Sequence, residues 1–429
     1  MSRRRGGARV RVREVPHGHG HGHVDAPTSR IARVVLLGFL AVVALGSVAG
    51  LVALWPSGDS AVEDVQYAAE GVTFPDAEVL AVREACPVIA VGPGLETPEG
   101  AEEFPEGCNE IDVRLTSGPE EGDEATVQTE PSVVRSGLRA GDDVVLLRIP
   151  PADEAAPVVY GFSHTHREAP LLGMTVLFVV VVAVVARLRG LLALLGLVFA
   201  AAVMWWFVIP GLLAGESGVA VAVVGSTVIM FVVLYLAHGP SIRTSTALAG
   251  TFLGIAVTAL LGMWAVDAAR LSGMSGEGSE MLQLYADGLD YKALLSAGIV
   301  IAGLGVLNDV TITQSSAVWE LRAAAPDLTR RELFSRGMRI GRDHIASTIY
   351  TIVFAYAGTA LGVLLLLSLY DRQASHVLSD DMLSEEVVRT LASAIGLVAS
   401  VPITTAVAAL TVSGARARSA VPEHEDARA

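Results

Sequence analysis

The sequence predicts an all-α polytopic membrane protein of about eight transmembrane helices that carries a small external β-barrel-like domain of OB or SH3-like type. Three observations support this fold class. The 429-residue chain is 52% hydrophobic and only 17% charged, whereas soluble proteins carry about 25% charged residues. Apolar runs near the roughly 20 residues that cross a bilayer recur along the chain. Residues 56–170 instead contain short segments with β-branched residues and partial alternation of polar and apolar positions, as strands do.

These patterns divide the chain into five parts. Residues 1–33 are expected to be a disordered Arg- and His-rich tail, and 34–55 a first transmembrane helix. Residues 56–170 are expected to form an acidic external β domain, 171–412 a seven-helix membrane domain, and 413–429 a second tail. The apolar runs that justify the eight spans are 34–55, 171–186, 191–213, 219–237, 247–266, 293–307, 345–369 and 391–412.

The first span is expected to remain as an anchor rather than to be cleaved as a signal peptide. It follows a polar stretch of 33 residues, and it is longer than the apolar core of a typical signal peptide. The exit of this span, Leu54-Trp55-Pro56-Ser57-Gly58, lacks a clear small-x-small cleavage site.

Arginine sets the expected orientation, because Lys292 is the only lysine. Cytoplasmic loops of membrane proteins carry an excess of basic residues. With eight spans, every arginine-rich connection falls on the side of the amino terminus, and the opposite connections, 267–290 and 371–386, are rich in acidic residues. We therefore expect both termini in the cytoplasm and residues 56–170 outside.

The external segment is strongly acidic. It holds 6 Arg against 24 Asp and Glu, a formal charge of −18, which argues against nucleic acid as a partner. Such a surface could collect cations or could simply be a solvated face. Five short strands are expected from β-branched content and turn residues, at 77–82, 110–115, 124–129, 143–149 and 158–163.

The two cysteines of the chain, Cys86 and Cys108, bracket an insert rich in Pro, Gly and Glu. Because both lie on the side expected to be oxidising, a disulfide that closes this loop is the first interpretation. Two free or metal-binding thiols are the alternative.

The amino-terminal tail contains His17, His19, His21 and His23, which alternate with glycine. In an extended chain their imidazoles would share one side, and such tracts bind zinc or nickel in some proteins. A disordered tail without a metal is the alternative. No other cofactor is expected.

A polar stripe ends the sixth apolar run. If the helix continues, Asp309, Thr313, Ser316 and Glu320 share one face, with Asn308 beside them. A carboxylate inside a membrane helix is costly and therefore indicates a functional site. The alternative is that the helix leaves the membrane at Leu307 and that the stripe is a wet cytoplasmic face.

Two further residues carry structural expectations. Asp343, which follows Gly341, is expected to cap the seventh helix. Pro402 is expected to interrupt the eighth span, and broken membrane helices often build ion or substrate sites.

The segment 305–321, with its Asn308-to-Ser316 motif and Glu320, resembles the signature of the YibE/F-like family of bacterial multi-pass membrane proteins. The likeness extends to Gly341-Arg342-Asp343-His344 and Tyr356-Ala357-Gly358. The resemblance implies a polytopic permease-type protein of the bacterial cell membrane, in which Asp309, Ser316 and Glu320 match recurring polar positions. Asn308 and Thr311 stand where the family pattern has small or apolar residues.

No P-loop, His-Glu-x-x-His or Gly-x-Ser-x-Gly motif is present, so the common ATPase, zincin and hydrolase classes lack support and an enzyme is not expected. Two functions remain open. The chain could be a transporter with an ion or proton site near Asp309, or a non-transporting envelope protein whose external domain binds a partner while the helices anchor it. The expected partners are the lipid bilayer and an ion or small solute, and the sequence does not indicate an oligomeric state.

Overall fold

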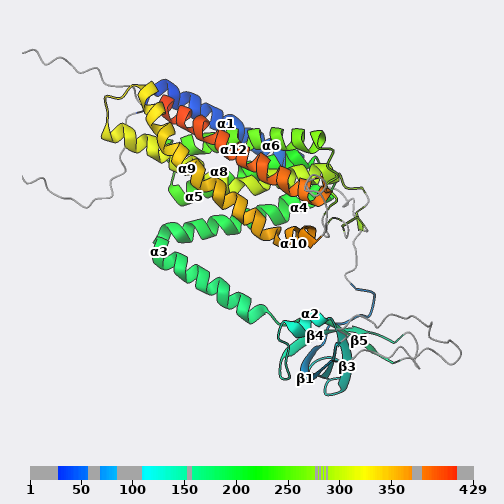
Figure 1. Ribbon diagram of the computed structural model, residues 1–429. Coiled ribbons are helices and arrows are strands. Elements are labelled where there is room, and N and C mark those ends of the chain that lie inside the picture. The colour runs from blue at the N-terminus through cyan, green and yellow to red at the C-terminus, as the bar shows by residue number, and fades with distance from the viewer. Residues whose placement is uncertain are drawn as a thin grey trace, which may run out of the picture. The chain divides into compact units, whose positions relative to one another are not determined.

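The computed structural model describes residues 28–56, 68–84, 109–151, 157–275, 279, 282–283, 285–286, 288–369 and 379–412. Its contacts divide the chain into a β-rich unit, residues 64–191, and a helical unit, residues 1–63 with 192–429. The helix α3 (Glu168–Val203) crosses this division in sequence. Figure 1 shows the elements of both units.

The helical unit is built from long helices in antiparallel succession (Figure 1). Its described elements other than α3 are α1 (Arg30–Ala53), η1 (Met204–Val208, a π-helical turn), α4 (Ile209–Leu213), α5 (Gly218–His238), α6 (Ile242–Ala268), α8 (Tyr291–Ala324), α9 (Arg330–Thr359), α10 (Leu361–Leu369) and α12 (Asp381–Thr411).

Among the described residues, six helices are long and apolar enough to cross a membrane, or seven if the bent pair α9 and α10 forms one span. The sequence predicts eight. The difference arises at α3, where the predicted runs 171–186 and 191–213 join in one helical stretch, Glu168–Leu213. That stretch contains a break at Arg187, whose φ of 53° and ψ of −140° leave the helical region.

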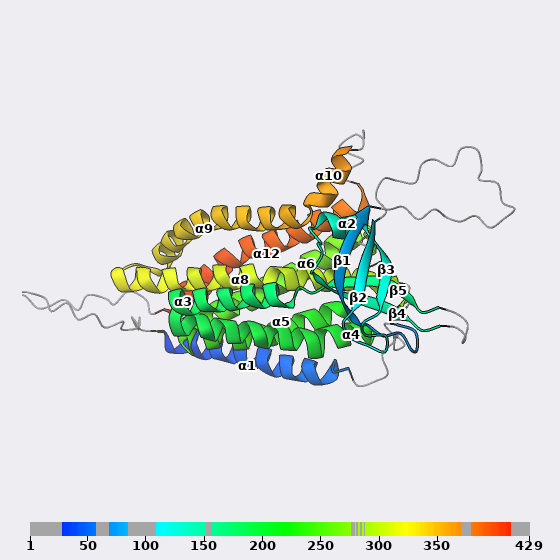
Figure 2. The ribbon, with the colours of Figure 1, turned by 90° about the horizontal axis from the view of Figure 1, so that it is seen from below.

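The seventh predicted span differs in shape as well as in extent. α9 starts at Arg330, well before the predicted residue 345, and meets α10 at an angle of 64°. Figure 2 shows α10 turning away from the end of α9. The start is set by Thr329, which accepts a hydrogen bond from the Glu332 backbone N–H while the Glu332 carboxylate accepts one from the Thr329 N–H. The expectation that Asp343 caps this helix is therefore wrong, because Asp343 lies inside it.

The centre of the helical unit is the close approach of α6, α8 and α12. A methyl group at Gly396 of α12 would lie 1.9 Å from Thr258 Oγ1 of α6, and one at Gly250 would lie 2.1 Å from Thr404 Oγ1. Small residues allow such close helix packing. Pro402 lies inside α12, which runs from Asp381 to Thr411. The expected interruption at Pro402 is therefore not seen.

The β-rich unit is a five-stranded antiparallel sheet in the order β3-β2-β1-β4-β5. The strands match the predicted segments closely, and β3 and β4 match them at both ends. They are β1 (Asp76–Glu84), β2 (Asn109–Leu115), β3 (Glu124–Thr129), β4 (Asp143–Ile149) and β5 (Val159–Thr165). A short helix, α2 (Pro131–Arg135), connects β3 to β4, and Figure 2 labels all five strands.

The edge strands β3 and β5 lie against each other, so the sheet nearly closes around one core. Alternate residues of the strands point into this core, as the sequence pattern predicts. The core residues are Ala77, Val79, Ile111, Val113, Val127, Leu138, Val144 and Leu146. Arg148 and Tyr160, from β4 and β5, both donate hydrogen bonds to the Glu120 carboxylate, and Arg148 lowers the pKa of that carboxyl.

A small ionic cluster joins β1 to the start of α3 within the β-rich unit. His166 Nε2 lies 3.2 Å from Asp76 Oδ1, and its Nδ1 lies 3.2 Å from Glu168 Oε2. Partial burial opposes the charged imidazole, but the carboxylates of Glu168 and Asp76 outweigh it, so the pKa of His166 is raised above its ordinary 6.5.

This raised pKa predicts a pH-dependent stability of the β-rich unit. A histidine whose pKa is raised in the folded state stabilises that state fully at pH values below its unfolded-state pKa, which is about 6.5. This stabilisation disappears as the pH rises through the folded-state pKa. His166→Gln should therefore lower the melting temperature below pH 6 by about 2 °C, and should change it little above pH 8. Circular dichroism of the full-length protein measures this, with His164→Gln as the control. A constant difference at all pH values would contradict the ionic cause.

Candidate functional site

The polar stripe lies on one continuous helix. α8 runs unbroken from Tyr291 to Ala324, so the residues of the stripe do share a face. Asp309, Thr313 and Glu320 are exposed, and Ser316 is half-buried. The opposite face of α8 is buried against α6 and α12, and it includes Thr311 and Gln314.

Hydrogen bonds between helices set the level of the stripe along the bundle. Thr311 bonds to Thr251 of α6 at 2.7 Å, and Gln314 Nε2 donates to Thr405 Oγ1 of α12 at 2.7 Å. α6 begins at Ile242, nine residues before Thr251. On α8, Asp309 lies two residues further from the start of α6 than Thr311 does. Its distance from the start of α6 along the bundle is therefore about 16 Å.

Two glycines of α9 bring that helix close to α8. Gln314 Nε2 also donates to the Gly337 carbonyl at 2.9 Å. A methyl group at Gly341 would lie 2.6 Å from Val401 Cγ1 and 3.0 Å from Gln314 Oε1. His344 is one turn after Gly341, and it therefore lies over the stripe of α8.

The structure brings His344 to two residues of the stripe. His344 Nε2 lies 3.8 Å from Asp309 Oδ2 and 3.4 Å from Thr313 Oγ1. The Asp309 side chain is 65% exposed and that of His344 is 33% exposed. A carboxylate, an imidazole and a hydroxyl at these distances can share a proton or ligate a small cation together with water.

The other predicted residues lie outside this cluster. Glu320 is eleven residues from Asp309, about 16 Å along the helix, too far for the two carboxylates to act on one ion. Asn308 is next to Asp309 in sequence, and its buried Oδ1 has no hydrogen-bond partner among the described residues. We refer to Asp309, Thr313 and His344 as the α8–α9 cluster.

Sequence reasoning missed His344 as a site residue. Its signal was present in the segment Gly341-Arg342-Asp343-His344, where Gly341 permits close approach and His344 follows one helical turn later. Only the pairing of α9 with α8 shows which carboxylate this histidine faces.

Several predicted site residues lie outside the described residues. They are Cys86 and Cys108, expected to form a disulfide, and His17, His19, His21 and His23, expected as weak metal ligands. Both expectations therefore stay predictions. Within the part of the chain that the structure describes, no group of three or more His, Cys, Asp or Glu is arranged to hold a metal ion.

The comparison with known families agrees with the motifs around the α8–α9 cluster. The sequence profile described as YibE/F-like protein matches residues 174–414, more than half of the chain. No curated protein and no solved structure matches the sequence. The matched range contains α8, α9 and the whole α8–α9 cluster. This membrane protein belongs to the YibE/F-like family.

Proposed function

We propose that this protein is a multi-pass permease of the bacterial cell membrane, in which Asp309 holds the proton or cation that is coupled to movement of an ion or small solute. The observation that carries the proposal is the approach of His344 to Asp309 and Thr313 across two helices. Asp309 and His344 come from different helices, so a change in their separation would alter the affinity of the site for an ion.

The cost of burying charge in hydrocarbon supports a hydrated path at this cluster. The bilayer core is about 30 Å thick, so a level about 16 Å from the start of α6 corresponds to its interior. An ionised carboxylate facing lipid there costs several kcal/mol. Asp309 is mostly exposed in the isolated chain, so in a membrane its stripe faces water or protein rather than lipid. Asp, Glu and His form proton relays in many transporters.

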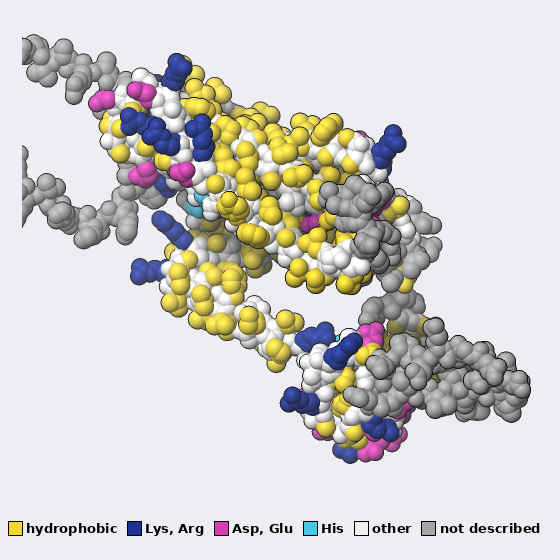
Figure 3. All heavy atoms as spheres, in the orientation of Figure 1, with side chains coloured by type: hydrophobic (Ala, Val, Ile, Leu, Met, Phe, Trp, Pro, Cys, Tyr) yellow, Lys and Arg dark blue, Asp and Glu magenta, His cyan; other side chains and the backbone are white. Residues whose placement is uncertain are grey.

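We further propose eight crossings, with the two parts of α3 on either side of Arg187 crossing separately. Residues 168–186 and 188–213 are each long enough to span, since about 20 residues suffice. Both termini are then cytoplasmic and the β-rich unit is external. Figure 3 supports this orientation, because Lys and Arg side chains gather where α9 begins while hydrophobic side chains cover the flank of the helical unit. Basic residues favour the cytoplasmic side.

Accessibility labelling tests this topology. Single cysteines at Ser136 and Ser379, both exposed, should react with an impermeant maleimide in intact cells in a background where Cys86 and Cys108 are replaced. A cysteine at Ser335, also exposed, should react only after the cells are opened. Labelling at Ser335 in intact cells would reject the eight-span topology.

Flux measurements test the transport proposal directly. The full-length protein in proteoliposomes should move protons when a salt or solute gradient is imposed, and an internal pH-sensitive dye reports this movement. Candidate ions and small solutes are supplied one at a time. Complete absence of flux with folded protein across such a series would count against a permease.

One observation favours the alternative of a non-transporting envelope protein. The strand order β3-β2-β1-β4-β5, with a helix between β3 and β4, supports an OB-type barrel, a fold whose loops often bind other molecules. The acidic charge of this segment would select a basic protein or peptide rather than nucleic acid. Cross-linking from Ser136 in intact cells would capture such a partner. Transport is preferred because seven helices exceed what an anchor needs.

A further inference from the structure

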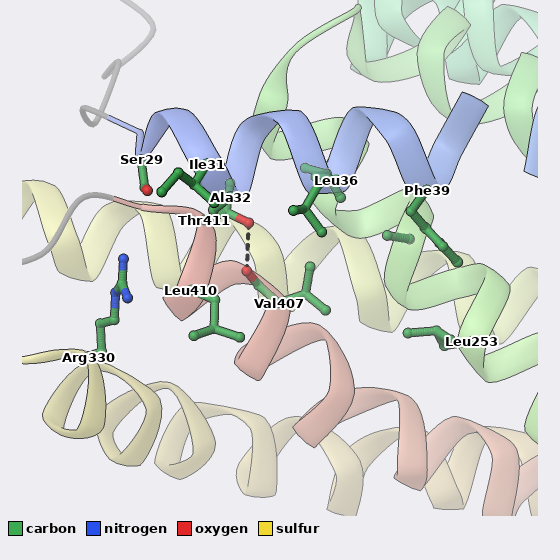
Figure 4. A pocket seen from close by; sticks show the side chains of 12 residues that line it. Ser29, Ile31, Ala32, Leu36, Phe39, Leu253, Arg330, Val407, Leu410 and Thr411 are labelled. Carbon is green, nitrogen blue, oxygen red and sulfur yellow. Dashed lines mark hydrogen bonds between the residues drawn. The ribbon is translucent and has the colours of Figure 1, made fainter. Parts of the chain in front are cut away.

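An apolar groove opens between α1, α6 and α12, at the end of the helical unit where α9 begins (Figure 4). Its volume is about 570 Å³. The aliphatic and aromatic side chains that line it include Ile31, Leu36, Phe39, Leu253, Val407 and Leu410. Polar groups occur at one end only, where Ser29, Arg330 and Thr411 lie.

The groove exists because α1 meets α12 only at its beginning. The Ser29 backbone N–H donates to the Thr411 carbonyl at 3.0 Å, and Thr28 pairs with Val412. Further along α1, Leu36 and Leu40 are buried in the core shared with α5 and α6. Ser29 and Phe39 are ten residues apart, so the groove follows α1 for about 15 Å.

The polar end of the groove carries positive charge without a counterion. Arg330 forms no ion pair within the described portion of the chain, and neither do Arg30 and Arg33 on the first turns of α1. Figure 4 shows the Arg330 side chain extended towards Ser29. An apolar channel with a basic mouth is complementary to a molecule with a long hydrocarbon chain and an anionic head.

We propose that this groove binds an anionic phospholipid of the membrane leaflet that contacts the start of α1, with one acyl chain between α1 and α12 and the phosphate at Arg330. The three helices that form the groove are all candidate membrane spans, so acyl chains surround it. Basic pockets between transmembrane helices are a known way to bind anionic head groups. The proposal depends on membrane insertion of these helices and not on transport at Asp309.

The tail before α1 is a poorer occupant. Residues 1–27 precede Thr28, which pairs with Val412 beside the groove, and the charged residues of this tail are mostly arginine. A basic segment would meet Arg330, Arg30 and Arg33 with like charge, which is unfavourable. A phosphate group instead pairs with an arginine through two hydrogen bonds.

Lipid titration of the full-length protein in detergent tests the proposal. Native mass spectrometry should show bound phosphatidylglycerol at concentrations where phosphatidylcholine does not bind. Arg330→Gln should weaken phosphatidylglycerol binding about fivefold, the effect of one basic residue at a membrane surface. The matched control is Arg331→Gln, which removes the same charge from the neighbouring residue of α9 outside the groove and should leave binding near wild type.

A second variant tests the apolar part. Leu253 lines the groove and is 37% exposed, so Leu253→Trp should fill the channel without disturbing the core. It should reduce phosphatidylglycerol binding with Arg330 still present, while the melting temperature in detergent alone stays near wild type.

Four results would overturn the proposal. They are equal binding of the two lipids, equal losses in Arg330→Gln and Arg331→Gln, unchanged binding in a folded Leu253→Trp protein, and displacement of the lipid by millimolar inorganic phosphate. A large gain in lipid binding after deletion of residues 1–27 would assign the groove to the tail instead. Conversion of a dimer to a monomer by Leu253→Trp, without any change in lipid binding, would assign it to a second copy.

Discussion

Asp309→Asn should nearly abolish ion-coupled flux and leave the protein folded. The substitution keeps the shape of the side chain and removes its charge, so the α8–α9 cluster loses the group that binds a proton or cation. Proton transfer by a positioned side chain typically contributes 10²-fold or more to a rate, and we expect flux to fall by about 100-fold. Proteoliposome flux with an internal pH-sensitive dye measures the effect.

Two further variants show whether the cluster acts as a unit. His344→Gln removes the imidazole that lies 3.8 Å from Asp309, and it should reduce flux. Glu320→Gln removes a carboxylate from the same exposed face of α8, about 16 Å further along, and should have little effect. Wild-type flux in a folded Asp309→Asn protein would reject the site and favour the envelope-protein alternative.

Gly396→Ala should destabilise the helical unit, whereas Gly305→Ala should not. The new methyl group at residue 396 would lie 1.9 Å from Thr258 Oγ1 and 3.1 Å from Thr258 Cβ. Thr258 cannot move aside easily, because it is fully buried and donates to the Gly254 carbonyl at 3.0 Å. Overpacking of a tight core typically costs about 1–3 kcal/mol.

The control glycine lies on the open face of α8. A methyl group at Gly305 would meet nothing within 4 Å, and Gly→Ala at an unstrained helical position stabilises by about 0.4–1 kcal/mol. Thermal unfolding in detergent should therefore show a lower melting temperature for Gly396→Ala and an equal or higher one for Gly305→Ala. Equal stabilities of the two variants would show that α6 and α12 are not tightly packed there.

The strands of the β-rich unit were predictable because their signals are local. Side chains alternate between core and solvent with a period of two, and glycine-containing turns such as those at Gly122 and Gly141 mark where each strand stops or starts. Both glycines adopt positive φ, a conformation that favours glycine, so the turn positions could be predicted from the sequence. The pairing order of the strands could not be predicted from the sequence. In the sheet, β1 lies between β2 and β4, and these two strands are distant in sequence.

The helical unit was less predictable at its breaks. Hydropathy locates apolar runs but does not distinguish a loop from a single non-helical residue, so two predicted spans became one helical stretch broken at Arg187. Asp343 has the residue type of a cap, but Thr329 and Glu332, fourteen and eleven residues earlier, form the capping box that starts α9. The polar first half of α9 carries no membrane signal, although it is helical.

By itself, the sequence determined the membrane class, the family resemblance, the five strands and the helix face that carries Asp309, because composition and periodicity act over a few neighbouring residues. Only the tertiary structure decided that His344 faces Asp309, that α9 bends into α10, and that a basic-mouthed groove opens beside α1. Each of these depends on side chains from helices far apart in the chain. Glycines at 337, 341, 250 and 396 set how closely those helices approach. The distance between two helices does not appear as a periodic pattern in the sequence of either helix, so the sequence alone could not predict it.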